Sequence, residues 1–432
     1  MKRELGFKEL LAIAVGAMVG GGIFTILGIA VAMVGSLAPF AIAFGGVLAG
    51  LASYGYVKLG LYYKDEGGSY SFFKRTFPDS HLAGSFIGWY TIFGYVSTLA
   101  IYSYTFSSYT ISGFSSSEIA RKLVAVAILA VFMWINLKSV KGVGKLEDIM
   151  VYAKLLILSA ISIALIHFTK IDFSSFAVTL KQDFHSTTLP AILIVSAITF
   201  VAYEGFELVV NAVNEMVEPE KNIPKAIYSA VVLVSLIYFI VALSAVVAIP
   251  VDDLIRNKES ALADGAFNVL GEIGRDFVIF GAILATSSAI NSTLFGASRQ
   301  MARVASDGYL PKKLSIKNGT IPQFAVVAMA VLASVLIFLG GLRLILEFGS
   351  ITFIFVSLLI AVANLKIYKE TKSSLAVIWL SIVGLSVGAI LILYYEWEHN
   401  FEQLVAIGVI YLMLTVGAWI YSKSLGMKSQ EQ

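Results

Sequence analysis

Twelve apolar segments dominate this chain and limit what it can fold into. They lie near residues 8–34, 38–63, 82–112, 119–137, 143–168, 189–213, 225–249, 272–302, 322–340, 344–366, 374–395 and 401–422. About 20 apolar residues in a helix suffice to cross a hydrocarbon core of roughly 30 Å. Because lipid offers no hydrogen-bond partners, a spanning segment must pair its own backbone groups. We expect an all-α polytopic membrane protein with twelve transmembrane helices.

Composition agrees with this class and excludes several others. Apolar residues make up 58% of the chain and charged residues only 14%, and the mean hydropathy is +0.85, which no soluble domain needs. The net charge of +3 predicts no nucleic-acid partner. Cysteine is absent, so neither disulfides nor thiolate metal sites can form. The first apolar run is long and lacks a small-residue cleavage site, so we expect a mature span rather than a signal peptide.

The joins between segments predict the orientation. Most of the 31 Lys and Arg residues fall in joins on the same side as the two termini. Basic residues concentrate in cytoplasmic loops of membrane proteins. We therefore expect a multi-pass plasma-membrane protein with both termini in the cytoplasm. Pro39, Pro190, Pro224 and Pro322 stand at expected segment starts, where a missing N–H costs little.

Three consecutive glycines, Gly20, Gly21 and Gly22, interrupt the middle of the first segment. Each costs a helix about 1 kcal/mol relative to alanine. A break here would leave free N–H groups on Gly21, Gly22 and Ile23 at the start of a second half-helix. Such a helix start favours an anion, and a carboxylate suits it. Close packing between helices is the alternative explanation, since small residues also allow membrane helices to approach.

The sixth segment carries a matching interruption. It places Glu204, Gly205 and Glu207 near the expected bilayer centre, where a carboxylate is expensive and points to function. Segments one and six are five apart, and an odd offset inverts one half of the chain against the other. Paired interruptions of this kind are typical of the midplane binding site of a secondary transporter.

The residues at both interruptions resemble a known family. Gly20 to Phe24 resembles the Gly-Ser-Gly-Ile-Phe signature of amino acid–polyamine–organocation transporters. Ala202 to Glu207, followed by Asn214-Glu215 and by Glu218 to Pro224, is similar to the family's sixth span and exit loop. The resemblance implies a leucine-transporter-type fold with broken helices one and six. Its two inverted repeats of five spans would cover residues 1–170 and 188–366, with peripheral spans eleven and twelve at 374–424.

The resemblance also implies where a substrate amino acid binds. Its carboxylate would lie on the amides of Gly21, Gly22 and Ile23, beside Gly20, and its ammonium on the carbonyls of Met18, Val201 and Glu204. Its side chain would face Phe200, Val201, Tyr203 and Glu204. The sequence departs from the family at Gly21, where serine is usual, and at Glu204, where relatives are often apolar.

We expect different roles for the two acidic side chains of the sixth segment, Glu204 and Glu207. An ionised Glu204 that faces the pocket would favour a cationic substrate, whereas a neutral Glu204 bonded within the bundle would say little about specificity. Both interpretations stay open. Glu207 matches an acidic family position, and we expect it to connect the sixth span to its neighbours or to take part in gating.

A lysine deep in the fifth segment points to ion coupling. Lys154 stands about three helical turns inside the segment, too deep for its head to reach the interface easily. Burial disfavours its charged form, so such a lysine can gain and lose a proton. In proton-coupled relatives a fifth-span lysine replaces the sodium ion that others hold near hydroxyls of the eighth span, which Ser287 and Ser288 match. A permanently paired structural lysine is the alternative.

Together these features predict secondary active transport of amino acids by alternating access, with proton-coupled uptake. The expected partners are an amino acid, protons and the lipid bilayer, with no cofactor and no metal. An amino acid/polyamine exchanger and a non-transporting amino acid sensor on the same fold are the alternatives. We expect no enzyme, because the chain has no cysteine nucleophile and no His-Glu-x-x-His metal motif.

Overall fold

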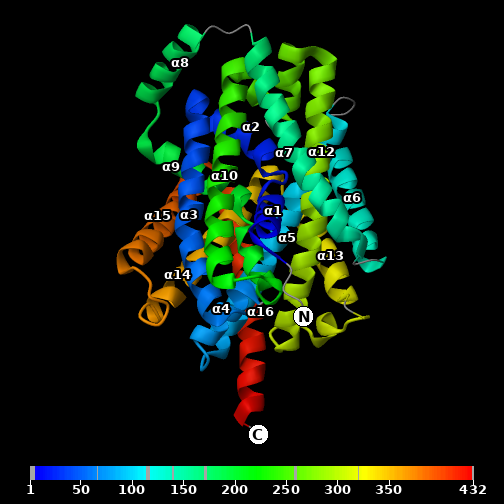
Figure 1. The fold of residues 1–432 in the computed structure, drawn as a ribbon, viewed down its shortest axis with the longest axis vertical. Helices are drawn as coiled ribbons and strands as arrows, with labels where there is room; N and C mark the ends of the chain where they lie inside the picture. The colour runs from blue at the N-terminus through cyan, green and yellow to red at the C-terminus, as the bar shows by residue number, and fades with distance from the viewer. Residues whose placement is uncertain are drawn as a thin grey trace.

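A computed structural model describes residues 5–65, 67–112, 117–138, 141–169, 173–256, 260–319 and 321–430. These residues form a bundle of helices (Figure 1). The first half contains α1 Phe7–Met18, α2 Gly22–Val34, η1 Gly35–Leu37, α3 Ala38–Tyr63, α4 Gly68–Thr76, α5 His81–Ile111, α6 Glu118–Lys138, α7 Lys141–Phe168 and α8 Phe173–Ser186. The second half contains α9 Leu189–Ile198, η2 Thr199–Tyr203, η3 Phe206–Glu215, α10 Pro219–Ala248, α11 Val251–Arg256, α12 Ala261–Ser306, η4 Lys312–Ser315, α13 Gln323–Leu339, α14 Leu342–Lys366, α15 Leu375–His399 and α16 Phe401–Gln430.

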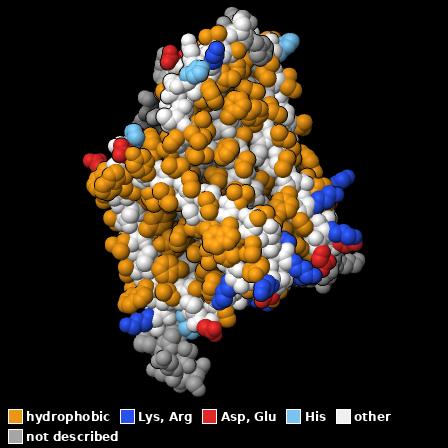
Figure 2. Space-filling view, turned by 90° about the vertical axis from the view of Figure 1, so that its left-hand side faces the viewer, with side chains coloured by type: hydrophobic (Ala, Val, Ile, Leu, Met, Phe, Trp, Pro, Cys, Tyr) orange, Lys and Arg blue, Asp and Glu red, His pale blue; other side chains and the backbone are white. Residues whose placement is uncertain are grey.

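The helices confirm the all-α polytopic architecture. Each of the twelve apolar segments corresponds to one helix or to a broken pair. Within the described residues, 8 helical stretches are long and apolar enough to cross a membrane by length and composition alone, and α13 is a shorter apolar helix. Figure 2 shows apolar side chains over the middle of one face, with charged side chains gathered toward its ends. This distribution suits a bilayer around the bundle.

Segments one and six are both interrupted, as predicted. The first is divided into α1 and α2 at the glycine triplet, and the sixth passes from α9 through η2 and η3. Non-helical backbone at the depth of a membrane is tolerated only where protein surrounds it or where it lines a water-filled cavity. Here both breaks are enclosed by protein, since the residues from Gly20 to Ile23 and from Thr199 to Phe206 are all buried. The predicted inverted repeats over 1–170 and 188–366 stay a prediction.

Two boundaries differ from the sequence prediction, and one helix lies in a join between segments. Helix α10 begins at Pro219, so Pro224 lies inside it rather than at its start. Helix α12 begins at Ala261, in the outer join, and turns at Gly271, whose φ of 70° is favourable only for glycine. Helix α4 forms in the join after α3, outside the twelve segments, and its first residues are buried against the bundle. Burial of this face against protein, rather than lipid, fixes α4 on the bundle.

Both termini lie at one end of the bundle, which we call the terminal end (Figure 1). Helix α4 lies at this end, whereas α2 and α8 lie at the opposite one. Helix α10 packs against α3 and α1, and α12 packs against α5 and α7. A short backbone pairing joins the two broken segments here: Leu5 N donates to Glu215 O at 3.0 Å, and Val217 N donates to Leu5 O at 2.9 Å.

Candidate functional site

The first break consists of Val19, Gly20 and Gly21, between α1 and α2. Gly20 N donates to Met18 O at 2.9 Å, and regular pairing resumes with Thr25 N donating to Gly21 O at 3.1 Å. The first amides of any α-helix have no partner within the helix. The amides of Gly22 and of the following Ile23 therefore lie at the positive end of α2. A helix start of this kind favours an anion, and the carboxylate site stays a prediction.

The glycine triplet is also a packing surface. A Cβ atom at Gly20 would lie 2.6 Å from Ala289 Cβ and 2.8 Å from the ring of Tyr102. A Cβ atom at Gly22 would lie 2.7 Å from Ala202 Cβ, on the second break. Both distances are too short for real carbon atoms. The two explanations of the triplet therefore coexist, because the same glycines open the helix and let its neighbours approach.

The second break lies at Glu204 and Gly205, between η2 and η3. Gly205 has a φ of 124°, a conformation that other residues rarely adopt. A Cβ atom on it would lie 2.8 Å from Ala17 Cβ and 2.9 Å from Met18 N. Gly205 thus touches the end of α1, while Gly22 touches Ala202. The two breaks interlock at both glycines, which places their free backbone groups in one site.

Tyr238 of α10 connects the two breaks, and the sequence analysis missed it. Its hydroxyl oxygen lies 2.8 Å from Met18 O and 3.1 Å from Ala202 O, so its single proton can be donated to either carbonyl. The phenol is fully buried. Tyrosine is enriched at the ends of membrane spans, so a tyrosine in the middle of a span is the sequence signal that could have identified Tyr238.

Ser350 of α14 supports the second break in the same way. Its hydroxyl donates to Ile198 O at 2.5 Å and accepts from Val201 N at 3.4 Å. Both backbone groups belong to the point where α9 gives way to the tighter turns of η2. A buried serine in the middle of span ten, which the sequence analysis also missed, thereby stabilises the irregular backbone.

Of the three carbonyls predicted to hold a substrate ammonium, those of Met18 and Val201 have partners in this conformation. Met18 O accepts from Tyr238, and Val201 O accepts from Glu204 N at 3.3 Å. A substrate ammonium would have to share these carbonyl oxygens with the present donors or displace those donors. The structure therefore places the predicted carbonyls of Met18 and Val201 at the breaks but shows them engaged.

Lys154 of α7 reaches the first break from the side. Its side chain is 1% exposed, and its Nζ donates to Gly16 O at 2.6 Å and to Ser288 Oγ at 3.4 Å. The ammonium group thus joins α1 to α12. Of the two predicted serines, Ser288 is buried against Lys154, whereas Ser287 is only partly buried. The predicted grouping of fifth, first and eighth spans is present through Ser288.

The two carboxyl groups of the sixth segment lie together and differ in their surroundings. Glu207 Oε1 accepts from the Tyr95 hydroxyl at 3.0 Å, and its Oε2 accepts from Gly205 N at 2.7 Å. Glu204 is equally buried, but neither of its oxygens has a hydrogen-bond donor among the described residues. The two carboxyl groups are close enough to influence each other electrostatically. Glu207 therefore connects η3 to α5, while Glu204 is left with its neighbour.

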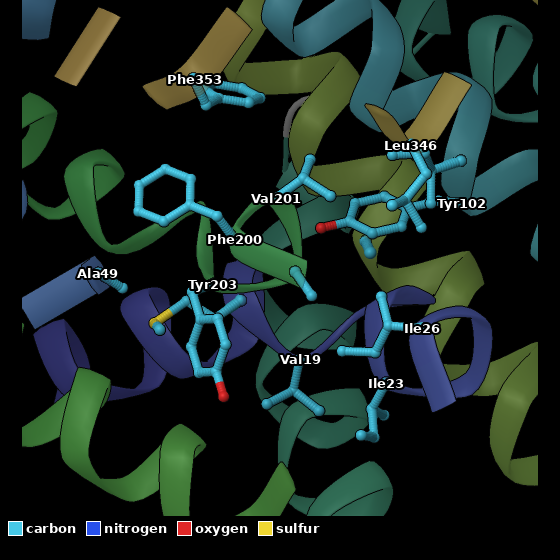
Figure 3. Close-up of a cluster of buried hydrophobic side chains, with 14 of the residues drawn as sticks. Val19, Ile23, Ile26, Ala49, Tyr102, Phe200, Val201, Tyr203, Leu346 and Phe353 are labelled. Carbon is cyan, nitrogen blue, oxygen red and sulfur yellow. The ribbon is translucent and has the colours of Figure 1, made fainter. Parts of the chain in front are cut away.

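Apolar side chains surround the breaks (Figure 3). Those labelled there are Val19, Ile23, Ile26, Ala49, Tyr102, Phe200, Val201, Tyr203, Leu346 and Phe353. Among the predicted specificity residues, Val201 lies beside Gly349 of α14. Tyr203 instead donates to Ile42 O of α3 at 2.7 Å and packs on the ring of Tyr238. Tyr203 therefore supports the second break from the α3 side.

The family described as amino acid permease matches residues 5–420. The chain belongs to the amino acid permease family. The match covers both breaks, Lys154 and Tyr238, so the described site lies within the family's shared region. A membrane-embedded amino acid transporter is the class to which this geometry belongs.

Individual relatives of this permease are transporters by name. It is similar to the inner membrane transport protein YbaT of Escherichia coli, with 30% identity over 96% of this chain and 95% of that protein. It is also similar to the mouse large neutral amino acids transporter small subunit 2, with 29% identity over 73% of this chain and 60% of the relative. The mouse Asc-type amino acid transporter 1 is 28% identical over 73% of this chain and 61% of its own length.

Proposed function

We propose that this permease takes up neutral amino acids by proton-coupled alternating access. The observation that carries the proposal is the Lys154 ammonium, which bridges Gly16 O at the first break and Ser288 Oγ of α12. A sodium ion would bridge the same kind of oxygens in a sodium-coupled carrier. A protonated lysine has three N–H donors and can bridge the same oxygens, so that the proton, rather than sodium, is the coupling ion.

The coupling follows from what deprotonation removes. A neutral Lys154 amine loses its charge and weakens its hold on the Gly16 carbonyl, so α1 can move away from α7 and α12. Reprotonation restores the bridge. A proton binding and leaving once per cycle therefore shifts the population between closed and open arrangements. Both termini would face the cytoplasm. A plasma-membrane location is supported by the name of the bacterial relative, an inner membrane transport protein.

A neutral substrate is supported by the surroundings of the breaks. The side chains around them are apolar, including Val19, Ile23 and Val201 (Figure 3). Glu204 is the acidic exception, but it lies against Glu207, which already accepts two hydrogen bonds. Two buried carboxyls in contact share a proton at less cost than they carry two charges. Because Glu207 already has two donors and Glu204 has none among the described residues, we assign the proton to Glu204 and the remaining negative charge to Glu207. Glu204 itself then presents no charge to a cationic substrate. The name of the mouse relative, a large neutral amino acids transporter, agrees.

Purified protein in liposomes tests this proposal. Radiolabelled L-leucine should accumulate when the outside is made acidic, and a sodium gradient at equal pH should have no effect. Unlabelled L-lysine should compete far less than L-methionine. Uptake that requires internal amino acid at every pH would instead identify an exchanger. Leucine binding without any flux would identify a sensor, and sodium-driven uptake would contradict proton coupling.

A further inference from the structure

A second polar site lies nearer to the terminal end of the bundle, between α4, η3 and α12. The side chain of Gln300, on α12, is 7% exposed, yet neither its Nε2 nor its Oε1 has a hydrogen-bond partner in the described part of the chain. Asn211 Oδ1, on η3, is also buried without a donor there. Buried polar groups in folded proteins almost always have hydrogen-bond partners, so these unpaired groups require an explanation.

These groups meet the start of α4. A Cβ atom on Gly68, the first residue of α4, would lie 2.9 Å from Asn211 Oδ1 and 3.9 Å from Gln300 Nε2. Gly68 has a φ of 53°, and glycine tolerates both the conformation and the crowding. The first amides of α4, up to that of Tyr70, lack partners within the helix; the next, Ser71 N, donates to Gly67 O.

The nearest acid does not fill this site. Asp65 Oδ1 accepts from Gly67 N at 2.9 Å, and Asp65 Oδ2 pairs with Arg75 at 3.2 Å. Burial alone would raise the pKa of Asp65, but hydrogen bonds from Ser71 and Gly67, together with Arg75, hold it below its ordinary value. The carboxylate is therefore ionised and balanced by Arg75. The amides that follow Gly67 remain available to another group.

We propose that Gln300, Asn211 and the start of α4 form a second binding site for the transported amino acid, on its route to the terminal end. The α4 amides and Gln300 Nε2 are donors for a carboxylate. Asn211 Oδ1 and Gln300 Oε1 are acceptors for an ammonium. The site thus offers complementary groups to both ends of a zwitterion, whereas an apolar solute would leave all of them unpaired.

The position of the site suits a step in release. Asn211 follows Glu207 by one turn on η3, the half of the broken segment that continues toward the terminal end. Tyr56 lies near both Glu207 and Ser69, the second residue of α4. Polar groups therefore continue from the breaks to α4. A substrate that leaves the breaks toward the cytoplasm would meet Asn211 and Gln300 before reaching water. This inference rests on the proposed transport function and on the proposed orientation.

The test compares the two sides of the membrane. L-Leucine half-saturation is measured from each side in liposomes whose outward-facing or inward-facing population is selectively blocked. Gln300→Met keeps length and volume but removes both polar atoms. It should raise half-saturation from the terminal-end side roughly tenfold and leave the other side within twofold. Asn211→Leu should show the same sidedness. Gln323→Met, at the start of α13, is the matched control and should change neither side.

Stability gives the second readout. Removal of an unpaired buried amide should leave the unfolding temperature without substrate unchanged or raised, because no protein hydrogen bond is lost. Equal changes on both sides of the membrane, or no change on either, would overturn the second site. A lowered unfolding temperature would also overturn it, because Gln300 would then be a structural group. Wild-type protein that carries leucine from neither side would refute the proposed function, and the second site with it.

Discussion

The Lys154 ammonium lies 2.6 Å from the carbonyl oxygen of Gly16, so a side chain of α7 holds the end of α1 next to the glycine break. This contact makes Lys154→Ala the most direct test of coupling. The variant should fold and still exchange labelled for unlabelled leucine, because its substrate groups are intact. Acid-driven accumulation should fall at least tenfold, and the pH profile should become flat. An unchanged pH profile would mean that another group carries the proton.

The glycine triplet predicts a ranked mutational series. Gly22→Ala places a carbon 2.7 Å from Ala202 Cβ, and Gly20→Ala places one 2.6 Å from Ala289 Cβ, so both should lose most folded protein. Gly21→Ser meets Thr286 Cγ2 only at 3.0 Å, and small shifts can relieve that contact. It should accumulate as monodisperse protein and retain leucine binding. Size-exclusion yield and leucine-dependent thermal shifts measure both. Equal tolerance at all three positions would refute the interlocked arrangement.

Tyr238→Phe removes the proton shared by Met18 O and Ala202 O and nothing else. The buried carbonyls then lack this donor, which should cost about 1–3 kcal/mol of stability without substrate. A bound ammonium can supply the missing donor, so leucine should raise the variant's unfolding temperature more than that of the wild type. Tyr90→Phe, whose hydroxyl contacts Thr415 of α16, is the control. Equal stabilisation of both proteins by leucine would show that the ammonium binds elsewhere.

The absence of cysteine allows a direct test of orientation. A single cysteine at Asn318, in a join at the terminal end, should react with a membrane-impermeant maleimide only after the cells are opened. A cysteine at His399, in the join between α15 and α16, should react in intact cells. Leucine uptake by each variant confirms that the protein is folded. The reverse labelling pattern would invert the proposed orientation and the direction of release.

The sequence predicted the architecture well because membrane burial imposes strong patterns. Apolar length predicted the twelve long segments but not the short helices α8 and α11 between them. The glycine triplet indicated the first break, and two carboxylates beside Gly205 indicated the second. Boundaries were less predictable: Pro224 was expected to start span seven, but α10 begins a turn earlier at Pro219. A proline is compatible with either position near a helix start, so local propensity does not decide between them.

The candidate site was predictable only where one residue type is costly. Lys154 and Glu207 were identified because charge at membrane depth demands a reason. Tyr238 and Ser350 carry no charge, and tyrosine and serine are common in this chain. Their roles depend on which backbone carbonyls their hydroxyls reach, and that is a property of packing between distant helices. Tyr203 shows the reverse case, since its neighbours in the chain suggest a pocket residue while its hydroxyl bonds to α3.

The backbone pairing of Leu5 with Glu215 and Val217 couples the movements of the two broken segments. It connects the start of α1 to the end of η3 through backbone atoms, so no side-chain substitution can abolish it directly. If α1 moves outward at the terminal end, there are two possibilities. Either η3 moves with α1 as one rigid body, or the two backbone hydrogen bonds break first. A joint movement of α1 and η3 keeps both hydrogen bonds intact. It would also open the path past Glu207 and Asn211 at the same time as the first break is released.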